Sequence, residues 1–285
     1  GENGEGQLGL GNITNYSSPK QVGALTTWSS VSCGSYHTVS IKTDGTIWSW
    51  GLNTYGQLGL NNITNYSSPK QVGALTNWSS VSCGNYHTVS IKTDGTLWSW
   101  GRNNYGQLGL NNSNAYNSPK QVGALTNWSS VSCGANHTVS IKTNGTLWSW
   151  GYNLLGELGD STSTDKSSPI QIGSLQNWQE VQASSSISHM IKNDGTLWAW
   201  GANNGGQLGQ GDTTTRSAPT QIGTDNSWTK VSAGNDSSFA IRTDGALFGW
   251  GLNTNGILGQ SNTTSLSSPT IISSGTSFTN ISATQ

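Results

Sequence analysis

Charged side chains are scarce in this 285-residue chain, where Lys, Arg, Asp and Glu make up only 9% of the residues. An average globular protein has about a quarter. The 12 basic and 13 acidic residues nearly cancel, and the basic ones are thinly spread with no basic run. Because binding to nucleic acid normally needs a positive patch that neutralises phosphates, we expect no nucleic-acid partner.

Long apolar runs are also missing. The apolar stretches are only a few residues long, whereas a membrane-spanning helix needs about 20. We therefore expect no insertion into a membrane.

Tryptophan, by contrast, is abundant, with 14 copies in a chain that is otherwise rich in Gly, Ser, Thr and Asn. Disordered chains are poor in aromatic residues because they have no core in which to bury them. The composition therefore predicts a folded protein despite its modest apolar content.

The tryptophans belong to an internal repeat with a strict period of 50 residues. The string W-x-W-G-x-N-x-x-G-x-L-G starts at Trp48, Trp98, Trp148 and Trp198, with Phe248 in place of the first Trp in the fifth copy. The second aromatic of the string is Trp50, Trp100, Trp150, Trp200 and Trp250. We interpret 1–285 as one domain with repeats at 1–50, 51–100, 101–150, 151–200, 201–250 and, in part, 251–285.

Each copy contains signals for four short strands. In the first copy these are Ser18–Leu25, Trp28–Gly34, His37–Lys42 and Thr46–Asn53. The Asp44-Gly45 pair between the last two predicts a two-residue type I′ hairpin, with positive φ at both positions. Pro19 and its counterparts open the first strand, where a missing N–H is tolerated.

Four antiparallel strands in every 40 to 50 residues are typical of a propeller blade. The predicted fold is therefore all-β: a β-propeller of four-stranded antiparallel blades, with about six blades present and one incomplete.

The longer pattern V-S-C-G-x-x-H-T-V-S-I-K-T-D-G-T-x-W-S-W-G-x-N-x-x-G-Q-L-G, as at Val31–Gly59, resembles the regulator of chromosome condensation repeat. The resemblance covers essentially the whole chain and implies a propeller of that family, commonly seven-bladed. The first residues are the tail of the repeated string, and the last copy stops in its second strand, near Ile281. We expect a fragment of a longer propeller with five complete blades and half of another; a ring closed by a thin blade is the alternative.

One repeat position holds the three cysteines, Cys33, Cys83 and Cys133, and becomes alanine in later copies. These cysteines could in principle form a metal site or disulfides, but no C-x-x-C spacing exists. Replacement by alanine favours a small buried side chain.

A second position holds three histidines, His37, His87 and His137. A ring of imidazoles could bind a metal ion. The family resemblance instead implies a structural histidine that bonds to a nearby backbone carbonyl.

Catalytic patterns are missing. Asp44 and three of its counterparts are aspartates of hairpin turns, and the other acids are scattered. No nucleophile elbow, P-loop or metalloprotease spacing occurs. We expect neither an enzyme nor a cofactor or metal ion.

The segments that follow each G-x-L-G are the most variable part of the repeat, and variable loops on a rigid scaffold are common binding elements. The candidate binding residues in these loops are Asn12, Tyr16, Asn62, Tyr66, Asn114, Tyr116, Lys166 and Arg216. Tyr36, Tyr55, Tyr86 and Tyr105 add further amphipathic surface. Plain solvated loops are the alternative reading.

The resulting hypothesis is a noncatalytic binding or structural module, part of a larger assembly, that contacts a protein or glycan partner. Low charge and a surface rich in Ser, Thr and Asn favour an extracellular place, on a cell surface or a virion. The alternatives are an intracellular regulator of a small GTPase, by family analogy alone, and a glycan-active enzyme, which would need convergent carboxylates.

Overall fold

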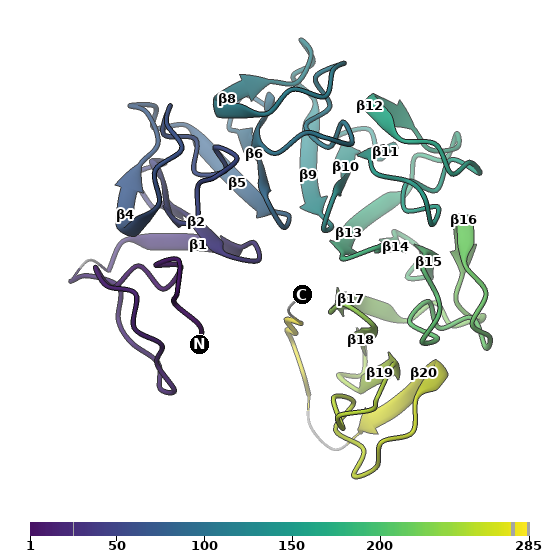
Figure 1. Cartoon of the computed structure of the whole chain (residues 1–285). Helices are drawn as coiled ribbons and strands as arrows, with labels where there is room; N and C mark the ends of the chain where they lie inside the picture. The colour runs from purple at the N-terminus through teal and green to yellow at the C-terminus, as the bar shows by residue number, and fades with distance from the viewer. Residues whose placement is uncertain (25, 275–276, 284–285) are drawn as a thin grey trace.

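The computed structural model describes residues 1–24, 26–274 and 277–283 and shows five four-stranded antiparallel sheets set side by side around a common centre (Figure 1). The predicted all-β propeller is confirmed. Among the described residues there is no helix, and so none long and apolar enough to cross a bilayer.

The five sheets are called blades 1 to 5. Blade 1 comprises β1 (Trp28–Cys33), β2 (His37–Lys42), β3 (Ile47–Gly51) and β4 (Tyr66–Gln71). Blade 2 comprises β5 (Trp78–Cys83), β6 (His87–Lys92), β7 (Leu97–Gly101) and β8 (Tyr116–Gln121). Blade 3 comprises β9 (Trp128–Cys133), β10 (His137–Lys142), β11 (Leu147–Gly151) and β12 (Lys166–Gln171). Blade 4 comprises β13 (Trp178–Ser184), β14 (Ile187–Lys192), β15 (Leu197–Gly201) and β16 (Arg216–Gln221). Blade 5 comprises β17 (Trp228–Ala233), β18 (Ser237–Arg242), β19 (Leu247–Gly251) and β20 (Leu266–Ser273).

The first predicted strand of each copy is in fact the outermost strand of the preceding sheet. β4 starts at Tyr66, so Pro69 lies inside this edge strand rather than opening it. An edge strand tolerates proline because one row of its N–H groups has no sheet partner. In the first copy the prediction of a strand at Ser18–Leu25 was wrong for residues 18–24, and Leu25 lies outside the described residues. The strand that would pair with 18–24 is not part of the described chain.

The hairpin turn between β2 and β3 also differs from the prediction. Gly45 has a φ of 77°, but Asp44 does not have a positive φ, so the turn is not type I′. The N–H of Gly45 donates to the Lys42 carbonyl and the N–H of Lys42 donates to the Thr46 carbonyl, both at 2.9 Å. This is a type I turn followed by a left-handed glycine. The Asp44 carboxylate fixes it by accepting hydrogen bonds from the Thr46 N–H and hydroxyl.

The C-terminal segment takes up a position that other copies fill with a strand. The N–H of Phe278 donates to the Gly245 carbonyl, as Trp78 does to Gly45. The N–H of Ala283 donates to the Ser232 hydroxyl at 2.8 Å, as Cys83 does to Ser32. Residues 278–283 therefore lie where the innermost strand of a further blade would lie, and the arc between the two ends is open (Figure 1).

The core lies between blades. Val39, Ile41 and Ile47 of blade 1 pack against Trp78 and Trp100 of blade 2, and the same cluster recurs at later junctions. Each blade thus presents an aliphatic face to the aromatic face of the next, and burial of these faces supplies the main driving force for folding.

Each junction is also fastened by a repeated pair of hydrogen bonds to one carbonyl. The indole N–H of Trp100 donates to the Gln57 carbonyl at 3.0 Å, and the Thr88 hydroxyl donates to the same oxygen at 2.9 Å. The other tryptophans at this position, which donate to the carbonyls of residues 7, 107, 157 and 207, are Trp50, Trp150, Trp200 and Trp250.

We predict that Trp150→Phe lowers the free energy of unfolding by about 2–4 kcal/mol, because it removes the bond to Gln107 and leaves a cavity. Trp148→Phe is the matched control, since the N–H of its partly exposed indole donates to Thr146 of its own blade and Phe248, which copy five has there, keeps a ring under the cation as Trp148 does under Lys142. Its cost should be below about 1 kcal/mol. Urea unfolding measures both, and equal losses would contradict the assigned role of the junction bond.

Candidate functional site

One end of the propeller, called the loop face, carries two kinds of connection. The turns that join the two inner strands of each blade (34–36 in blade 1) lie at the same end as the long loops that lead to the outermost strand (52–65). All the binding residues predicted from the sequence lie in these loops or at the first residue of the outermost strand.

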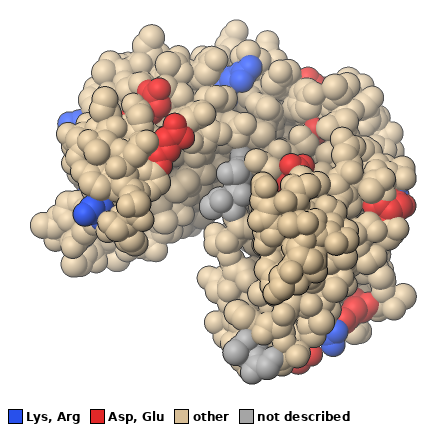
Figure 2. All heavy atoms as spheres, turned by 60° about the horizontal axis from the view of Figure 1, so that its bottom comes forward, with Lys and Arg blue, Asp and Glu red and all other residues tan. Residues whose placement is uncertain are grey.

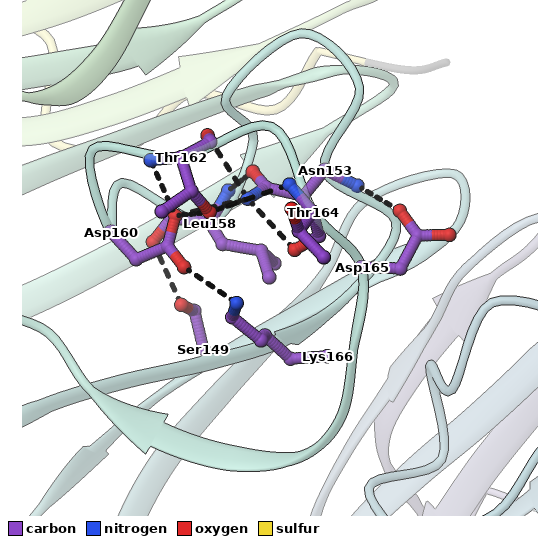
Figure 3. Close-up of polar contacts among 8 residues, drawn as sticks. All are labelled: Ser149, Asn153, Leu158, Asp160, Thr162, Thr164, Asp165 and Lys166. Carbon is purple, nitrogen blue, oxygen red and sulfur yellow. Dashed lines mark hydrogen bonds and ion pairs between the residues drawn. The ribbon is translucent and has the colours of Figure 1, made fainter.

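A buried asparagine holds each long loop in shape. In blade 3 the side-chain amide of Asn153 donates to the Asp160 carboxylate and to the Thr162 and Thr164 carbonyls at 3.0–3.2 Å (Figure 3). Its Oδ1 accepts from the Leu158 N–H at 2.9 Å. The equivalent asparagines are all fully buried: Asn3, Asn53, Asn103, Asn203 and Asn253. The sequence string contains this asparagine, but its role as the centre of the loop was missed.

The predicted residues of the first two loops bond to one another. The Asn12 amide lies 3.3 Å from the Tyr16 hydroxyl, and Asn62 lies 3.4 Å from Tyr66. Each tyrosine ring also contacts a lysine ammonium, Lys20 or Lys70, at 5.3 Å from its centroid.

The third loop uses a different asparagine from the one predicted. Asn112, not Asn114, donates to the Tyr116 hydroxyl at 3.3 Å, while Asn114 contributes only its backbone N–H to Asn112. In the fourth and fifth loops ion pairs replace this contact: Lys166 with Asp160 at 3.4 Å (Figure 3) and Arg216 with Asp212 at 2.6 Å. These side chains close their own loops, and their role in binding stays a prediction.

The cysteines lie near the propeller axis, at the ends of the innermost strands. Cys83 and Cys133 are buried as predicted, and burial raises the pKa of the Cys133 thiol to about 12. Cys33 is exposed, contrary to the prediction of a buried side chain, because no described blade precedes blade 1 to cover it. Among the described residues no group of His, Cys, Asp or Glu is placed to hold a metal ion.

The repeated histidines cross the blade junctions. The Nε2 of His37 lies 3.2 Å from the Thr88 hydroxyl of blade 2, and His87 and His137 make the same contact with Thr138 and Ser188. The partner is therefore a side-chain hydroxyl of the next blade and not the backbone carbonyl that the family resemblance implied. Burial lowers the pKa of His37 to about 4.

A further buried histidine, His189, occupies the position of Val39, Val89 and Val139. Its ring lies against Trp250 of the next blade, with 6.0 Å between centroids, and burial lowers its pKa to about 4. It is a core residue at the junction of blades 4 and 5.

One buried acid borders the loop face. Glu157 takes the place of Gln7, Gln57, Gln107 and Gln207, is fully buried, and accepts from the Leu155 N–H at 2.8 Å. Burial raises the pKa of its carboxyl to about 7, against the opposing effect of its hydrogen bonds.

Blades 1 to 3 carry a connected aromatic cluster on the loop face. The guanidinium carbon of Arg102 lies 5.3 Å from the ring centroid of Tyr55 and 5.7 Å from those of Tyr86 and Tyr105. We call these four residues the Tyr–Arg cluster. Tyr36 stacks on Tyr86 at 6.5 Å, and Tyr152 packs edge-on against Tyr105 at 4.8 Å.

Arg102 was missed in the sequence, although the repeat offered a signal. Its position carries an acid, Glu2, in the first copy and is uncharged in the others: Leu52, Tyr152, Ala202 and Leu252. Charge is rare elsewhere on the surface too: Figure 2 shows Lys, Arg, Asp and Glu as isolated spots with no continuous basic area on the visible face. A single cation among tyrosines therefore distinguishes this region.

Comparisons with known proteins agree with this architecture. The model of the RCC1-like domain matches residues 1–172, and that of the regulator of chromosome condensation (RCC1) repeat matches residues 194–241 and 244–284. A second model of the repeat matches residues 228–257.

Solved structures are similar in fold. Human WBSCR16 has a TM-score of 0.80 at 21% identity, over 90% of this chain and 70% of that one. Prp20p from Saccharomyces cerevisiae has a TM-score of 0.70 at 18% identity, over 96% of this chain and 84% of that one. A second structure shows yeast RCC1 (Prp20) bound to Kap60. Prp20p has been characterised for its binding to Gsp1p and histones.

We predict that acid destabilises the protein partly through His189. An unfolded imidazole, with a pKa near 6.5, takes up a proton before the buried one, so stability falls as the pH drops from about 6.5 to about 4. His189→Val, which matches Val139, should lose about 3 kcal/mol less over this window. Urea unfolding from pH 4 to 8 measures the difference, and parallel curves for the two proteins would refute it.

Glu157 should act in the opposite direction. Its pKa is raised in the folded state, so the stability it contributes is present below about pH 4.5 and is lost as the pH rises through about 7. Glu157→Gln, which matches Gln107, should be more stable than the parent at pH 8 by about 2 kcal/mol and lose this advantage below pH 5. Gln107→Glu is the reverse control and should lose stability at pH 8 relative to pH 5.

Proposed function

Because this chain belongs to the RCC1 repeat family of β-propellers, we propose that it is a noncatalytic module that binds a protein partner through the loop face of blades 1 to 3. Family membership supports a binding or regulatory module in general. The choice of surface rests on one observation: tyrosine side chains gather on this part of the loop face.

The exposed apolar side chains of the long loops support this choice. Ile13, Ile63 and Leu154 are each more than 60% exposed, and Tyr55 is 39% exposed. Interfaces are enriched in aromatic residues and arginine, so the tyrosines and Arg102 carry this choice and the exposed aliphatic side chains of the loops add apolar area to it.

Comparison of equivalent repeat positions shows that the loop face is aromatic in some copies and polar in others. At the position of Tyr55 and Tyr105, blades 4 and 5 carry Gly205 and Asn255. At the position of Tyr36 and Tyr86, the later copies carry Asn136, Ser186 and Asp236. The same scaffold is therefore aromatic in its first half and polar in its second, which favours a partner that contacts the first half.

A groove extends this surface toward the rim. It has a volume of about 380 Å³ and lies between the long loop of blade 1 and the outermost strand of blade 2. Its lining includes Tyr55, Ile63, Tyr116 and Lys120. A partner segment that crosses the Tyr–Arg cluster could continue into this groove, which would give Tyr116 the binding role predicted from the sequence.

Four of the acids have structural surroundings, which supports a noncatalytic role. Asp44 accepts from Thr46 within its turn, Asp160 and Asp212 pair with cations of their own loops, and Glu157 is enclosed at a junction.

We propose a location outside the cytoplasm, on a cell surface or virion, because charged residues are scarce and the chain is rich in Ser, Thr and Asn.

The test is selection of a random peptide library on the immobilised chain. The Tyr55→Asn, Tyr86→Asn, Tyr105→Asn triple variant takes its residues from Asn255 and Asn136, which the scaffold already accepts. We predict that the selected peptides bind this variant at least tenfold more weakly than the parent, because aromatic anchors contribute most of the binding energy of an interface. Fluorescence anisotropy gives the affinities.

The control variant changes the opposite end of the propeller. Leu75→Asp and Leu125→Asp replace two half-exposed leucines with the residue that copy five has at Asp225. Peptides that lose affinity on this variant, and not on the triple tyrosine variant, would overturn the proposed surface.

A further inference from the structure

We infer that Arg102 is the specificity-determining residue of the loop face and that it pairs with the carboxylate of an aspartate or glutamate in the partner. The inference rests on the proposed function, because it names the chemistry that the same surface recognises. It is carried by the position of one unpaired guanidinium among three tyrosine rings.

The guanidinium is enclosed by two consecutive blades. Tyr55 comes from the long loop of blade 1, Tyr86 from the inner turn of blade 2, and Tyr105 from the long loop of blade 2. Because three rings restrict the rotamers of Arg102, much of the entropy that a binding arginine normally loses is already lost in the free protein.

The charge of Arg102 has no anionic partner among the residues that the structure describes. The other two arginines are ion-paired, Arg216 with Asp212 and Arg242 with Asp225 and Asp244. The Nε of Arg102 is buried and makes no hydrogen bond. Pairing through its Nε edge is therefore blocked, and the Nη end of the guanidinium is the edge left for a ligand.

A carboxylate fits that edge. Its two oxygens can accept two parallel N–H bonds from a guanidinium, and a bond made beside the tyrosine rings is stronger than one in open water because the local dielectric is lower. Phosphorylated motifs, in contrast, are recognised by clusters of arginines. No second cation of the described chain lies over the rings of Tyr55, Tyr86 or Tyr105, so one carboxylate matches the available charge.

The scaffold does not need an arginine here. Leucine occupies the equivalent position in two other copies, at Leu52 and Leu252. Burying part of an unpaired charge costs free energy that an aliphatic residue would not cost. Arg102→Leu is therefore a variant that should fold, and it removes the charge while keeping the cluster apolar.

The test is a double-mutant cycle on the peptides selected as above. Peptides enriched on the parent chain, but not on Arg102→Leu, should carry Asp or Glu at a fixed position. Changing that residue to its amide should weaken binding to the parent about tenfold, or about 1.4 kcal/mol, and change binding to Arg102→Leu less than twofold. Phosphoserine at the same position should bind no more tightly than glutamate.

A nuclear magnetic resonance titration locates the contact. The chain has three arginines, and the two that are already paired serve as internal references. The glutamate peptide should shift the guanidinium resonance of Arg102 and leave those of Arg216 and Arg242 in place. Its glutamine counterpart, at equal occupancy, should shift the Arg102 resonance less and leave the other two in place.

The outcomes separate this inference from the proposed function. Peptides that depend on the three tyrosines but show no preference for an acid would overturn the role of Arg102 and leave the binding surface intact. Tighter binding of the phosphoserine peptide would overturn the carboxylate in favour of a phosphate. Peptides that ignore the tyrosines would overturn both proposals.

Discussion

The structure depends on one carbonyl oxygen per repeat. The Gln57 carbonyl of blade 1 accepts from the Trp100 indole and the Thr88 hydroxyl of blade 2, and the equivalent oxygens do the same at every junction described. A carbonyl in a long loop can accept two bonds from the next blade only if the loop is rigid. The buried Asn53, which bonds to both sides of its loop, provides that rigidity. The loops are therefore part of the scaffold, and the freedom to vary is left to side chains that point away from it.

This constraint explains why function concentrates at a few positions. Residues 52, 55 and 86 and their counterparts lie on the loop face but take no part in the asparagine network or the junction bond. They can change from Tyr to Asn or Gly, or from Leu to Arg, without disturbing the fold, as the copies themselves demonstrate. The Asn–Tyr and Asp–Lys pairs that close the loops have less freedom, because each partner compensates for the other.

The repeat made the fold predictable, since a 50-residue period with four strand signals describes a blade. The grouping of strands into blades was not predictable from the same signals, because the start of a repeat in the sequence does not have to be the start of a sheet. Only the pairing of β3 with β4 shows that the outermost strand belongs to the preceding sheet. The turn at Asp44 was missed for a local reason: the aspartate accepts from Thr46 and stabilises a three-residue loop. Cys33 was predicted as buried because its copies are, yet burial at this position comes from a neighbouring blade.

The Tyr–Arg cluster could not be predicted from the sequence for the same reason. Tyr55 and Arg102 are 47 residues apart, and a contact across a junction joins one copy to the next rather than two parts of one copy. At the preceding junction the corresponding residues are Glu5 and Leu52, so two nearly identical copies produce different surfaces. Two replacements, Glu to Tyr and Leu to Arg, change one junction and no other. Binding chemistry in this propeller is therefore a property of pairs of neighbouring blades, and it is set by the few positions at which adjacent copies differ.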